Sequence, residues 1–474
     1  MGDYLLGIDI GTTGVKAMVF SPDGNCLGRS YAEYPTMRPS LHACEQSPND
    51  WWNALVKTVR SACDVQGTAS GIAALSLSTQ GGTLVALDGF MEPIAPALVW
   101  SDTRCAAQRM QYERSFGKER MYRMSGWQAG NGLPAFQIKR LKDERPELFC
   151  KAAKFFSVAD YVTMRLTGQA LIDFSNAGIN QLADIEREVY DADMLEWLGI
   201  GEKNLSTLVP SGQNVGRLKK DAARELGLPE NVCVVSGAHD QYAAMSGAGI
   251  VREGTALIGT GTAWVICALS DKPRFETGFA QSRSAAGSPW GFLASLSNGG
   301  ICLSWLKENV LSGLSYKEID SEAEARPCGS SGLCFYPQSA SGASSAVEFR
   351  GMHLGHDRFD MAQAVMEGVS VRLLQLFRSF SGAGDIREVV FSGGAANSRF
   401  WSRLTCNVLG CPLSVSSTPD LPALGAAVLA GAGCGIFASV EEGCKKLHPE
   451  YDVLIPEKDK EPFEKLLEQY GKIQ

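Results

Sequence analysis

The sequence lacks the features that mark nucleic-acid-binding and membrane proteins. No block of basic residues occurs, and the 474 residues carry a net charge of −8. Because nucleic acids and anionic membranes attract basic surfaces, we expect the protein to bind neither. No apolar run reaches the roughly 18 residues needed to cross a membrane. No basic stretch followed by a short apolar run opens the sequence, so no secretory signal peptide is expected.

Cysteine pairs and the common phosphate-binding fingerprints are also missing. The fourteen cysteines are scattered, and no Cys-x-x-Cys pair occurs. This pattern favours free thiols in a reducing compartment over a zinc site, so we expect a cytoplasmic protein. Neither GxxxxGK[ST] nor GxGxxG in a strand-to-helix context is found. Any phosphate site must therefore be built in another way.

What is present is an alternation of strands and helices in a chain long enough for two domains. Residues 4–10 and 15–20 read as strands, and Pro22-Asp23-Gly24 predicts a hairpin turn after them. Ser47 to Asp50 has the form of a capping box, so a helix is expected to begin there. Further segments extend the α/β pattern: a strand in "IAALSLSTQGG" (72–82) that ends in a Gly-Gly loop, mostly helix over 134–168, a helix of small residues at 422–433 and an amphipathic helix at 461–473.

A strand–turn–strand pattern occurs twice. "LLGIDIGTTGVKAMVF" (5–20) and "ALIGTGTAWVICAL" (256–269) both place a Gly-Thr-rich turn between two apolar strands. A duplicated α/β domain with a cleft between the halves fits this repeat. The small, Gly-rich segment 243–255 is suited to a hinge between them. Closure about such a hinge would exclude water from the cleft.

Each Gly-Thr turn is either an ordinary hairpin turn or a loop that holds an anion. Glycine and threonine offer backbone N–H groups and hydroxyls to a phosphate, and Lys16 could add a cation. One such turn alone favours the hairpin, whereas two turns could enclose one polyphosphate. Asp9 is then either a turn-capping residue or a carboxylate on the magnesium side of that polyphosphate.

Two further segments carry polar residues suited to chemistry. In "VSGAHDQ" (235–241), Asp240 follows an apolar strand and precedes a helix of small residues. It is either an N-capping residue or a base that accepts a proton from a substrate hydroxyl. Gln80, Asp102 and Arg104 are either solvated loop residues or a wall that binds hydroxyl groups.

"FSGGAANSRFW" (391–401) predicts a strand, a Gly-Gly turn and a helix. Gly393 and Gly394 would let a flat ring lie against the backbone. Asn397 or Ser398 would cap the helix or contact a ribose.

These motifs, in this order, resemble the FGGY carbohydrate kinases, within them the xylulokinase-like branch. The resemblance runs over essentially the whole chain and includes "WSDTR" (100–104), "LGAAVLAG" (424–431) and "EFRGMHLGHDRFDMAQAVMEG" (348–368). It implies an α/β fold of two actin/hexokinase-like (ribonuclease H-like) domains with an interdomain cleft. The implied boundaries are residues 1–245 for the N-terminal domain, 246–440 for the C-terminal domain and 441–474 for a helical tail.

The resemblance also implies an ATP- and Mg²⁺-dependent kinase acting on a small sugar or polyol. Asp240 takes the position of the family's catalytic base, and Asp9, from its place beside the first Gly-Thr turn, is expected on the metal side of the phosphates. The implied substrate-binding residues are Gln80, Gly81, Gly82, Asp102, Arg104, Asp240 and Gln241. The implied nucleotide-binding residues are Gly11, Thr12, Thr13, Gly14, Lys16, Gly259, Thr260, Gly261, Gly300, Gly394, Ala395, Asn397 and Ser398.

The sequence departs from the family where sugar is bound. Xylulokinases carry Gln-Met-His-Gly where this chain has Gln80-Gly81-Gly82, so two sugar-contacting side chains are missing. Two other classes of function stay open. One is an actin- or Hsp70-like ATPase acting on protein partners, and the other is a sugar sensor without catalysis. A homodimer is possible in each case.

Overall fold

The computed structural model describes residues 3–286, 290–338, 346–381, 386–418 and 420–472. Their contacts divide the chain into two units, each made of separate stretches of sequence. The first unit comprises residues 1–252, 269–292 and 420–448, and the second comprises 253–268, 293–419 and 449–474. The division at residues 245/246 and 440/441 stays a prediction.

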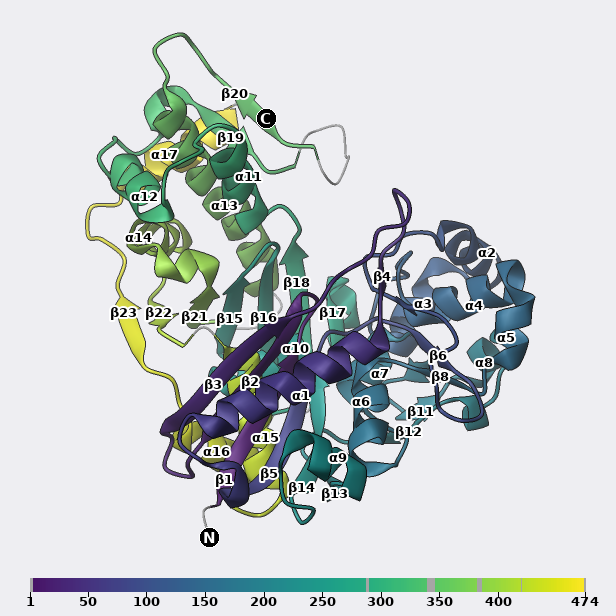
Figure 1. Cartoon of the computed structure of the whole chain (residues 1–474). Helices are drawn as coiled ribbons and strands as arrows, with labels where there is room; N and C mark the ends of the chain where they lie inside the picture. Colours follow the sequence, from purple (N-terminus) through teal and green to yellow (C-terminus); the bar gives the residue numbers. More distant parts are fainter. Residues whose placement is uncertain (1–2, 287–289, 339–345, 382–385, 419, 473–474) are drawn as a thin grey trace. The chain divides into compact units, whose positions relative to one another are not determined.

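The first unit is built on a six-stranded sheet in the order β13-β14-β5-β1-β2-β3. As the sequence predicts, β1 (Tyr4–Ile10) and β2 (Gly14–Phe20) are strands joined by a turn, and they form an antiparallel hairpin. The structure adds that β5 (Ile72–Thr79) lies parallel to β1. Side chains alternate between the two faces of a strand. Leu6, Ile8 and Ile10 therefore share one apolar cluster with residues of α1 (Pro48–Asp64), which covers that face (Figure 1).

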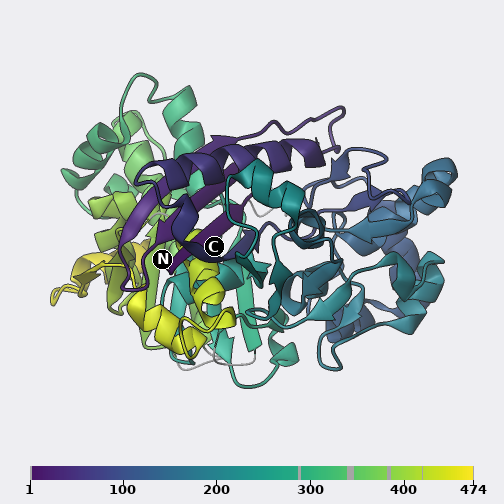
Figure 2. The same ribbon diagram turned by 60° about the horizontal axis from the view of Figure 1, so that its bottom comes forward.

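The opposite face of this sheet is covered by α15 (Leu421–Gly433), the predicted helix of small residues. In Figure 2 it lies near the N-terminus, although it is distant in the sequence. Glycines allow the close approach: a Cβ on Gly7 would lie 1.9 Å from the Ala423 carbonyl oxygen, and one on Gly425 would lie 1.8 Å from that of Ala243. Since Ala243 belongs to α10 (Asp240–Gly247), α15 fixes the helix that begins at Asp240.

A second, seven-stranded sheet has a closely related order; most of its strands belong to the second unit, whereas β17 (Ala280–Arg283) and the first residues of β18 (Trp290–Leu296) belong to the first. The order β17-β18-β16-β15-β21-β22-β23, read from its far end, repeats the pairing of the first sheet: an antiparallel edge strand, two parallel neighbours and an antiparallel hairpin. Here β15 (Thr255–Thr260) and β16 (Trp264–Ser270) form the hairpin, and β21 (Glu388–Gly393) is the parallel neighbour of β15. This match agrees with the predicted duplication.

The remaining helices and strands complete the two units. The other strands are β3 (Cys26–Glu33), β4 (Glu45–Gln46), β6 (Val85–Leu87), β7 (Ala97–Leu98), β8 (Lys154–Phe156), β9 (Leu171–Asp173), β10 (Ala183–Asp184), β11 (Val189–Tyr190), β12 (Thr207–Val209), β13 (Asn214–Arg217), β14 (Cys233–His239), β17 (Ala280–Arg283), β18 (Trp290–Leu296), β19 (Cys334–Tyr336), β20 (Glu348–Arg350), β22 (Leu413–Ser416) and β23 (Tyr451–Leu454). The other helices are α2 (Ala106–Phe116), α3 (Lys118–Ser125), α4 (Pro134–Glu144), α5 (Pro146–Lys151), α6 (Val158–Thr167), α7 (Phe174–Ile179), α8 (Ala192–Leu198), α9 (Lys220–Leu226), α11 (Gly300–Asn309), α12 (Tyr316–Glu324), α13 (Arg358–Ser381), α14 (Arg399–Leu409), α16 (Val440–Lys446) and α17 (Glu461–Lys472).

Two details differ from the sequence predictions. The stretch 134–168 is mostly helical as expected, but the short strand β8 interrupts it, where it pairs with β6. Helix α1 begins at the predicted place, yet the side chain of Ser47 makes no capping hydrogen bond. Pro48 at the first helical position has no N–H to satisfy, so a proline start needs less from the cap.

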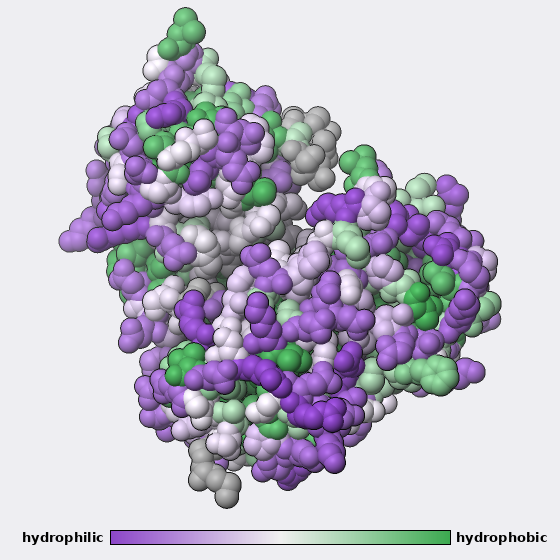
Figure 3. Space-filling view, viewed as in Figure 1, coloured by the Kyte–Doolittle hydropathy of each residue, from purple (hydrophilic) through white to green (hydrophobic). Residues whose placement is uncertain are grey.

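The surface and the thiols match the composition. The face seen in Figure 3 is largely hydrophilic, with apolar residues in small groups. All fourteen cysteines are free thiols. Of the helices in the described ranges, none combines the length and the apolar character needed to traverse a bilayer.

Candidate active site

The first Gly-Thr turn joins β1 to β2 and is held by its neighbours. The Gly11 N–H donates to the Gly14 carbonyl oxygen at 3.0 Å, which closes the turn. The Thr12 carbonyl oxygen accepts from Gln46 Nε2 at 2.7 Å, and its hydroxyl oxygen accepts from Trp100 Nε1 at 3.1 Å. Thr13 is exposed. The turn is thus a hairpin turn with a fixed backbone.

Asp9 lies on β1 just before this turn, and its carboxylate is buried. Oδ1 accepts a hydrogen bond from Ser78 Oγ on β5 at 2.7 Å. Burial raises the pKa of Asp9 to about 6, although the nearby ammonium of Lys16 and the Ser78 bond oppose the rise. Asp240 and Asp420 raise it further, because like charges disfavour ionisation. A carboxylate in this setting gains from a nearby cation.

Lys16 faces Asp9 across the hairpin and pairs with Asp420. Its Nζ lies 3.0 Å from Asp420 Oδ1. Burial works to lower the pKa of Lys16, but Asp420 and Asp9 outweigh it and the pKa is raised. Lys16, which the sequence predicts to contact phosphate, is therefore a charged lysine already paired with a carboxylate.

The segment after β5 carries Gln80, Gly81 and Gly82 to the same end of the sheet. The Gln80 N–H donates to the Ile10 carbonyl oxygen at 2.8 Å, and its Nε2 donates to Gln46 Oε1 at 3.1 Å. Gln80 Oε1 is buried and has no hydrogen-bond partner among the described residues. A Cβ on Gly81 would lie 2.5 Å from Cδ2 of His239. This segment therefore presents an unpaired acceptor and no side chain at residue 81.

Asp102 and Arg104 bind each other. Asp102 is fully buried, and its Oδ2 accepts the Cys44 N–H at 3.0 Å. Arg104 Nε donates to both Asp102 oxygens, at 3.0 and 2.9 Å, and Arg104 Nη2 pairs with Glu45 at 2.6 Å. Asp102 and Arg104 thus form an ion-pair network with Glu45 that holds the loop after β7, and the hydroxyl-binding wall of Gln80, Asp102 and Arg104 stays a prediction.

Asp240 begins α10 directly after β14. Its Oδ1 lies 3.3 Å from Nε2 of His239, and its side chain is 28% exposed. The His239 N–H donates to Ser175 Oγ at 2.8 Å, and Ser175 in turn donates to Asp173, the N-cap of α7. Asp240 is thus a partly accessible carboxylate on a rigid backbone, with Gln241 next to it in the first turn.

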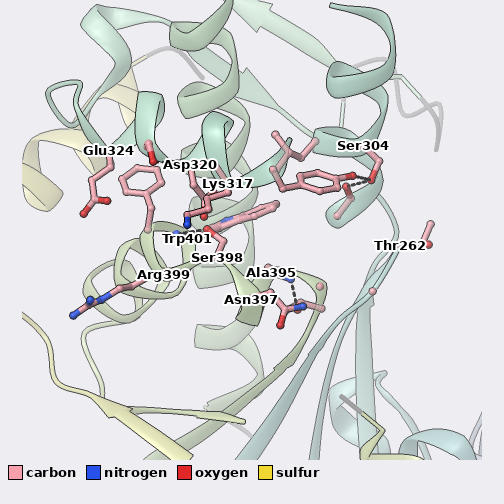
Figure 4. A pocket seen from close by; sticks show the side chains of 18 residues that line it. Thr262, Ser304, Lys317, Asp320, Glu324, Ala395, Asn397, Ser398, Arg399 and Trp401 are labelled. Carbon is pink, nitrogen blue, oxygen red and sulfur yellow. Dashed lines mark hydrogen bonds between the residues drawn. The ribbon is translucent and has the colours of Figure 1, made fainter. Parts of the chain in front are cut away.

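A cavity of about 660 Å³ lies in the second unit. It brings together Thr260, Gly261, Gly300, Gly394, Ala395, Asn397 and Ser398, all of which the sequence predicts to bind nucleotide. Figure 4 shows Lys317, Asp320 and Glu324 of α12 above the segment Ala395–Ser398. Burial raises the pKa of Asp320, the Ser398 hydroxyl lowers it and Glu324 raises it again. Polar groups thus line an otherwise apolar hollow.

Thr260 ties the two turns of this cavity together. Its hydroxyl donates to the Ser392 carbonyl oxygen at 2.7 Å and accepts the Ala395 N–H at 3.0 Å. Thr260 is 2% exposed, so its hydroxyl holds the turns and is not turned toward a ligand. Ser398 Oγ accepts the Trp401 N–H at 2.9 Å and caps α14, which is one of the two predicted roles.

The comparisons with known proteins decide the family. Residues 4–247 match the N-terminal domain of the FGGY family of carbohydrate kinases, and residues 254–434 match its C-terminal domain. The chain belongs to the FGGY family of carbohydrate kinases. It is therefore a sugar kinase, an α/β protein of two actin/hexokinase-like domains, similar to the xylulokinase-like branch as predicted.

Individual FGGY relatives agree over nearly the whole chain. A xylulose kinase of Bacillus subtilis is 28% identical over 96% of this chain and 93% of its own. A gluconokinase of the same species is 25% identical, over 93% and 88%. The ligand-bound xylulose kinase of Lactobacillus acidophilus has the same fold, with a TM-score of 0.90 and 22% identity over 99% and 97% of the two chains.

Sequence reasoning missed several residues of this FGGY chain. Helix α12 lines the cavity with Tyr316, Lys317 and Asp320, but its sequence carries only a helix start signal at Ser315 and nothing that points to a ligand. His239 directly precedes Asp240 in "VSGAHDQ" (235–241), and no role is predicted for it above. The sequence does point to it, because a histidine next to a candidate base forms a titratable pair with that base.

Proposed function

We propose that the protein transfers the γ-phosphoryl group of ATP to a hydroxyl of a small sugar, a ketose such as xylulose or a related sugar or polyol. The observation that carries the proposal is Asp240, a partly exposed carboxylate at the start of α10. Membership of a carbohydrate kinase family and relatives named xylulose kinase and gluconokinase support it.

In the proposed reaction, Asp240 accepts the proton of the sugar hydroxyl. The oxygen of that hydroxyl forms a bond to the γ-phosphorus while the bond from this phosphorus to the β,γ-bridging oxygen breaks, and ADP leaves. General-base assistance of this kind contributes about 10²- to 10⁴-fold. Asp240 suits the role because α10 is fixed by the close packing of Gly425 on Ala243.

The proposed sugar contacts come from the segment after β5 and from the start of α10. Gln80 Oε1 is a buried acceptor without a partner, which a sugar hydroxyl would satisfy. Gly81 and Gly82, which follow Gln80, would contact the sugar through their backbone, and Gln241 adjoins the base. Asp102 and Arg104 support this region through the loop that they hold.

The proposed nucleotide contacts are of two kinds. The backbone N–H groups of Gly11–Gly14 and Gly259–Gly261 would bind phosphate oxygens, together with the exposed Thr13 and with Lys16. The cavity next to Gly300, Gly394 and Asn397 has a volume of about 660 Å³, large enough for an adenosine. ATP as the phosphoryl donor fits both sets.

Asp9 is the proposed metal-side residue. The described residues contain no group of three or more Asp, Glu, His or Cys side chains able to hold a metal ion. The proposed site therefore rests on the Asp9 carboxylate, since proteins bind Mg²⁺ with one or two carboxylates while water and phosphate oxygens complete the shell. Bound there, Mg²⁺ would neutralise charge on the phosphate oxygens. Repulsion of Asp9 by Asp240 and Asp420 would be relieved by the same cation.

The proposal extends to the setting of the enzyme. All fourteen cysteines are free, which supports the proposed cytoplasmic location. A homodimer stays a prediction, which sedimentation of the purified chain would test.

The experiment is a screen of ADP release with MgATP over ketoses, aldoses, aldonates and polyols. The expected result is release that depends on one sugar class and yields a sugar phosphate in equal amount. ADP release that no carbohydrate stimulates would favour an ATPase acting on protein partners. Binding of a sugar without turnover would favour a sensor. Either outcome would overturn the proposal.

A further inference from the structure

His239 carries a buried imidazole that lies next to both the proposed base, Asp240, and the glycine pair Gly81-Gly82. Its side chain is 7% exposed, and its Nε2 lies 3.3 Å from Asp240 Oδ1. Its ring meets that of Trp127 edge-on at 5.9 Å and lies 5.7 Å from that of Tyr242. These contacts fix the plane of the imidazole.

The imidazole fills the space next to residue 81. A Cβ on Gly81 would lie 2.5 Å from His239 Cδ2 and 2.9 Å from Nε2, closer than real contacts allow. The imidazole of His239 can therefore occupy this position only because residue 81 has no side chain. In this chain the imidazole next to Gly81 belongs to His239 of β14, whereas in the Gln-Met-His-Gly motif of xylulokinases the histidine belongs to the segment that corresponds to the one after β5.

The two ring nitrogens have different surroundings. If Nε2 carries the proton, this proton lies on the nitrogen 3.3 Å from the Asp240 carboxylate oxygen, and Nδ1 is then an acceptor. Nδ1 is buried and has no hydrogen-bond partner among the described residues. The same holds for Gln80 Oε1 and for the indole N–H of Trp127. Two acceptors and one donor left unpaired near the base suit hydroxyl groups, which both donate and accept.

We propose that His239 is a positioning and substrate-recognition residue: Nε2 orients the Asp240 carboxylate, and Nδ1 accepts a hydrogen bond from a sugar hydroxyl. The proposal rests on the proposed role of Asp240 as base. It explains how a chain with Gly81 and Gly82 can still recognise a polyol, because the missing polar contact is supplied from β14.

Two substitutions separate the two nitrogens. The amide of asparagine reaches about as far as Nδ1, and that of glutamine about as far as Nε2. We expect His239→Asn to keep the KM for sugar within about 3-fold and to lower kcat at least 10-fold. We expect His239→Gln to keep kcat within about 5-fold and to raise the KM for sugar about 10-fold. His239→Ala should combine both losses, with an unchanged KM for ATP.

A double-mutant cycle tests the steric part. Gly81→Ala should raise the KM for sugar about 10-fold in the wild-type background and clearly less in His239→Ala, where the contact with the imidazole is gone and only the one with Ile179 Cγ2, at 2.9 Å, stays. Gly89→Ala is the matched control, because a Cβ there meets nothing within 4 Å. Thermal unfolding of every variant shows whether the fold is retained. If His239→Ala does not fold, the opposite shifts of the Asn and Gln variants decide the question.

The outcomes separate the two proposals. If the wild-type enzyme phosphorylates no carbohydrate, the proposed function fails. If it does so and the Asn, Gln and Ala variants keep wild-type kcat and KM, only the role of His239 is overturned. If the Asn and Gln variants show the same fall in kcat and the same rise in KM, together with a lowered melting temperature, His239 has only a structural role. That result would also overturn the role proposed for His239.

Discussion

The two strand–turn–strand hairpins have the same strand pairing and different chemistry. In the first unit, Asp9 pairs with Lys16 across the hairpin and with Ser78 on the parallel strand. In the second, Gly259 pairs with Val265 across the hairpin and with Ser392 on the parallel strand. The charged pair of the first hairpin is thus replaced by glycine and valine. The first hairpin therefore carries an acidic and a basic side chain next to its turn. The second has no charged side chain at the matching positions, and its glycine leaves the backbone uncovered.

The segments that follow β5 and β21, the strands parallel to β1 and β15, also differ in their chemistry. After β5 come Gln80, Gly81 and Gly82, with an unpaired polar atom nearby. After β21 come Gly394 and Ala395, which line the cavity of the second unit. The first copy of the sheet is therefore followed by a polar set suited to hydroxyl groups, and the second copy is followed by a turn that lines a cavity of about 660 Å³. The comparison therefore predicts that substitutions in the first unit affect sugar binding and phosphoryl transfer, and that substitutions around the cavity of the second unit affect nucleotide binding.

Asp240→Asn should have the largest effect. An amide cannot accept the hydroxyl proton, so kcat should fall by about 10³-fold. The dissociation constant for ATP should stay within about 3-fold, because the nucleotide cavity lies in the second unit. Steady-state kinetics and calorimetric titration with ATP measure the two. Asp221→Asn, in the first turn of α9, is the control and should be silent. Near-normal turnover of the Asp240 variant would contradict the assignment.

The buried Asp9 should give the first hairpin a pH dependence that the second lacks. Its pKa is about 6 in the folded state and near 3.8 in the unfolded chain. Between these values the folded state holds a proton that the unfolded state has lost, so this residue's contribution to stability falls as pH rises from about 4 to 6. Above pH 6 its ionisation disfavours the fold, by on the order of 3 kcal/mol.

Asp9→Asn should therefore be stabilised relative to the wild type at pH 8 and not at pH 4, although it loses activity at both. Urea unfolding at several pH values measures the difference. Asp23→Asn is the control of opposite sign: hydrogen bonds from Ser21 and from the backbone lower the pKa of Asp23, so its contribution is lost on acidification. A variant-minus-wild-type difference that does not change with pH would contradict the assigned burial of charge at Asp9.

Tyr316→Ala should weaken nucleotide binding alone. Tyr316 lines the cavity and its hydroxyl lies 3.1 Å from that of Ser304. Contact between an aromatic ring and a base contributes about 1–3 kcal/mol, so the KM for ATP should rise roughly 10-fold. The KM for sugar should not change. Trp305→Ala removes a half-exposed aromatic residue of α11 that does not line this cavity, and should leave both constants unchanged.

How far sequence reasoning reached follows from the range of the interactions. Local patterns predicted the hairpins, the strand within 72–82 and the helix 422–433, because turn residues and apolar periodicity act over a few neighbours. The order of motifs along the chain predicted the family. The pairing of Asp102 with Arg104 and the fully engaged hydroxyl of Thr260 were not predicted, since a motif gives residue types and not hydrogen-bond partners. The facing of Gly81 and His239 depends on two distant segments and needs the fold.

The smallest expected effect compares the threonines of the two hairpins. Thr260→Val removes a buried hydroxyl that both donates to the Ser392 carbonyl oxygen and accepts from the Ala395 N–H. It removes one hydrogen bond from each of two backbone groups in buried residues, so the free energy of unfolding should fall by about 1–3 kcal/mol. Thr12→Val removes one contact, from the half-exposed Trp100, and water can replace it. Its cost should be below about 0.5 kcal/mol. Urea unfolding of both variants measures the difference, and equal costs would show that the two hairpins are held in the same way.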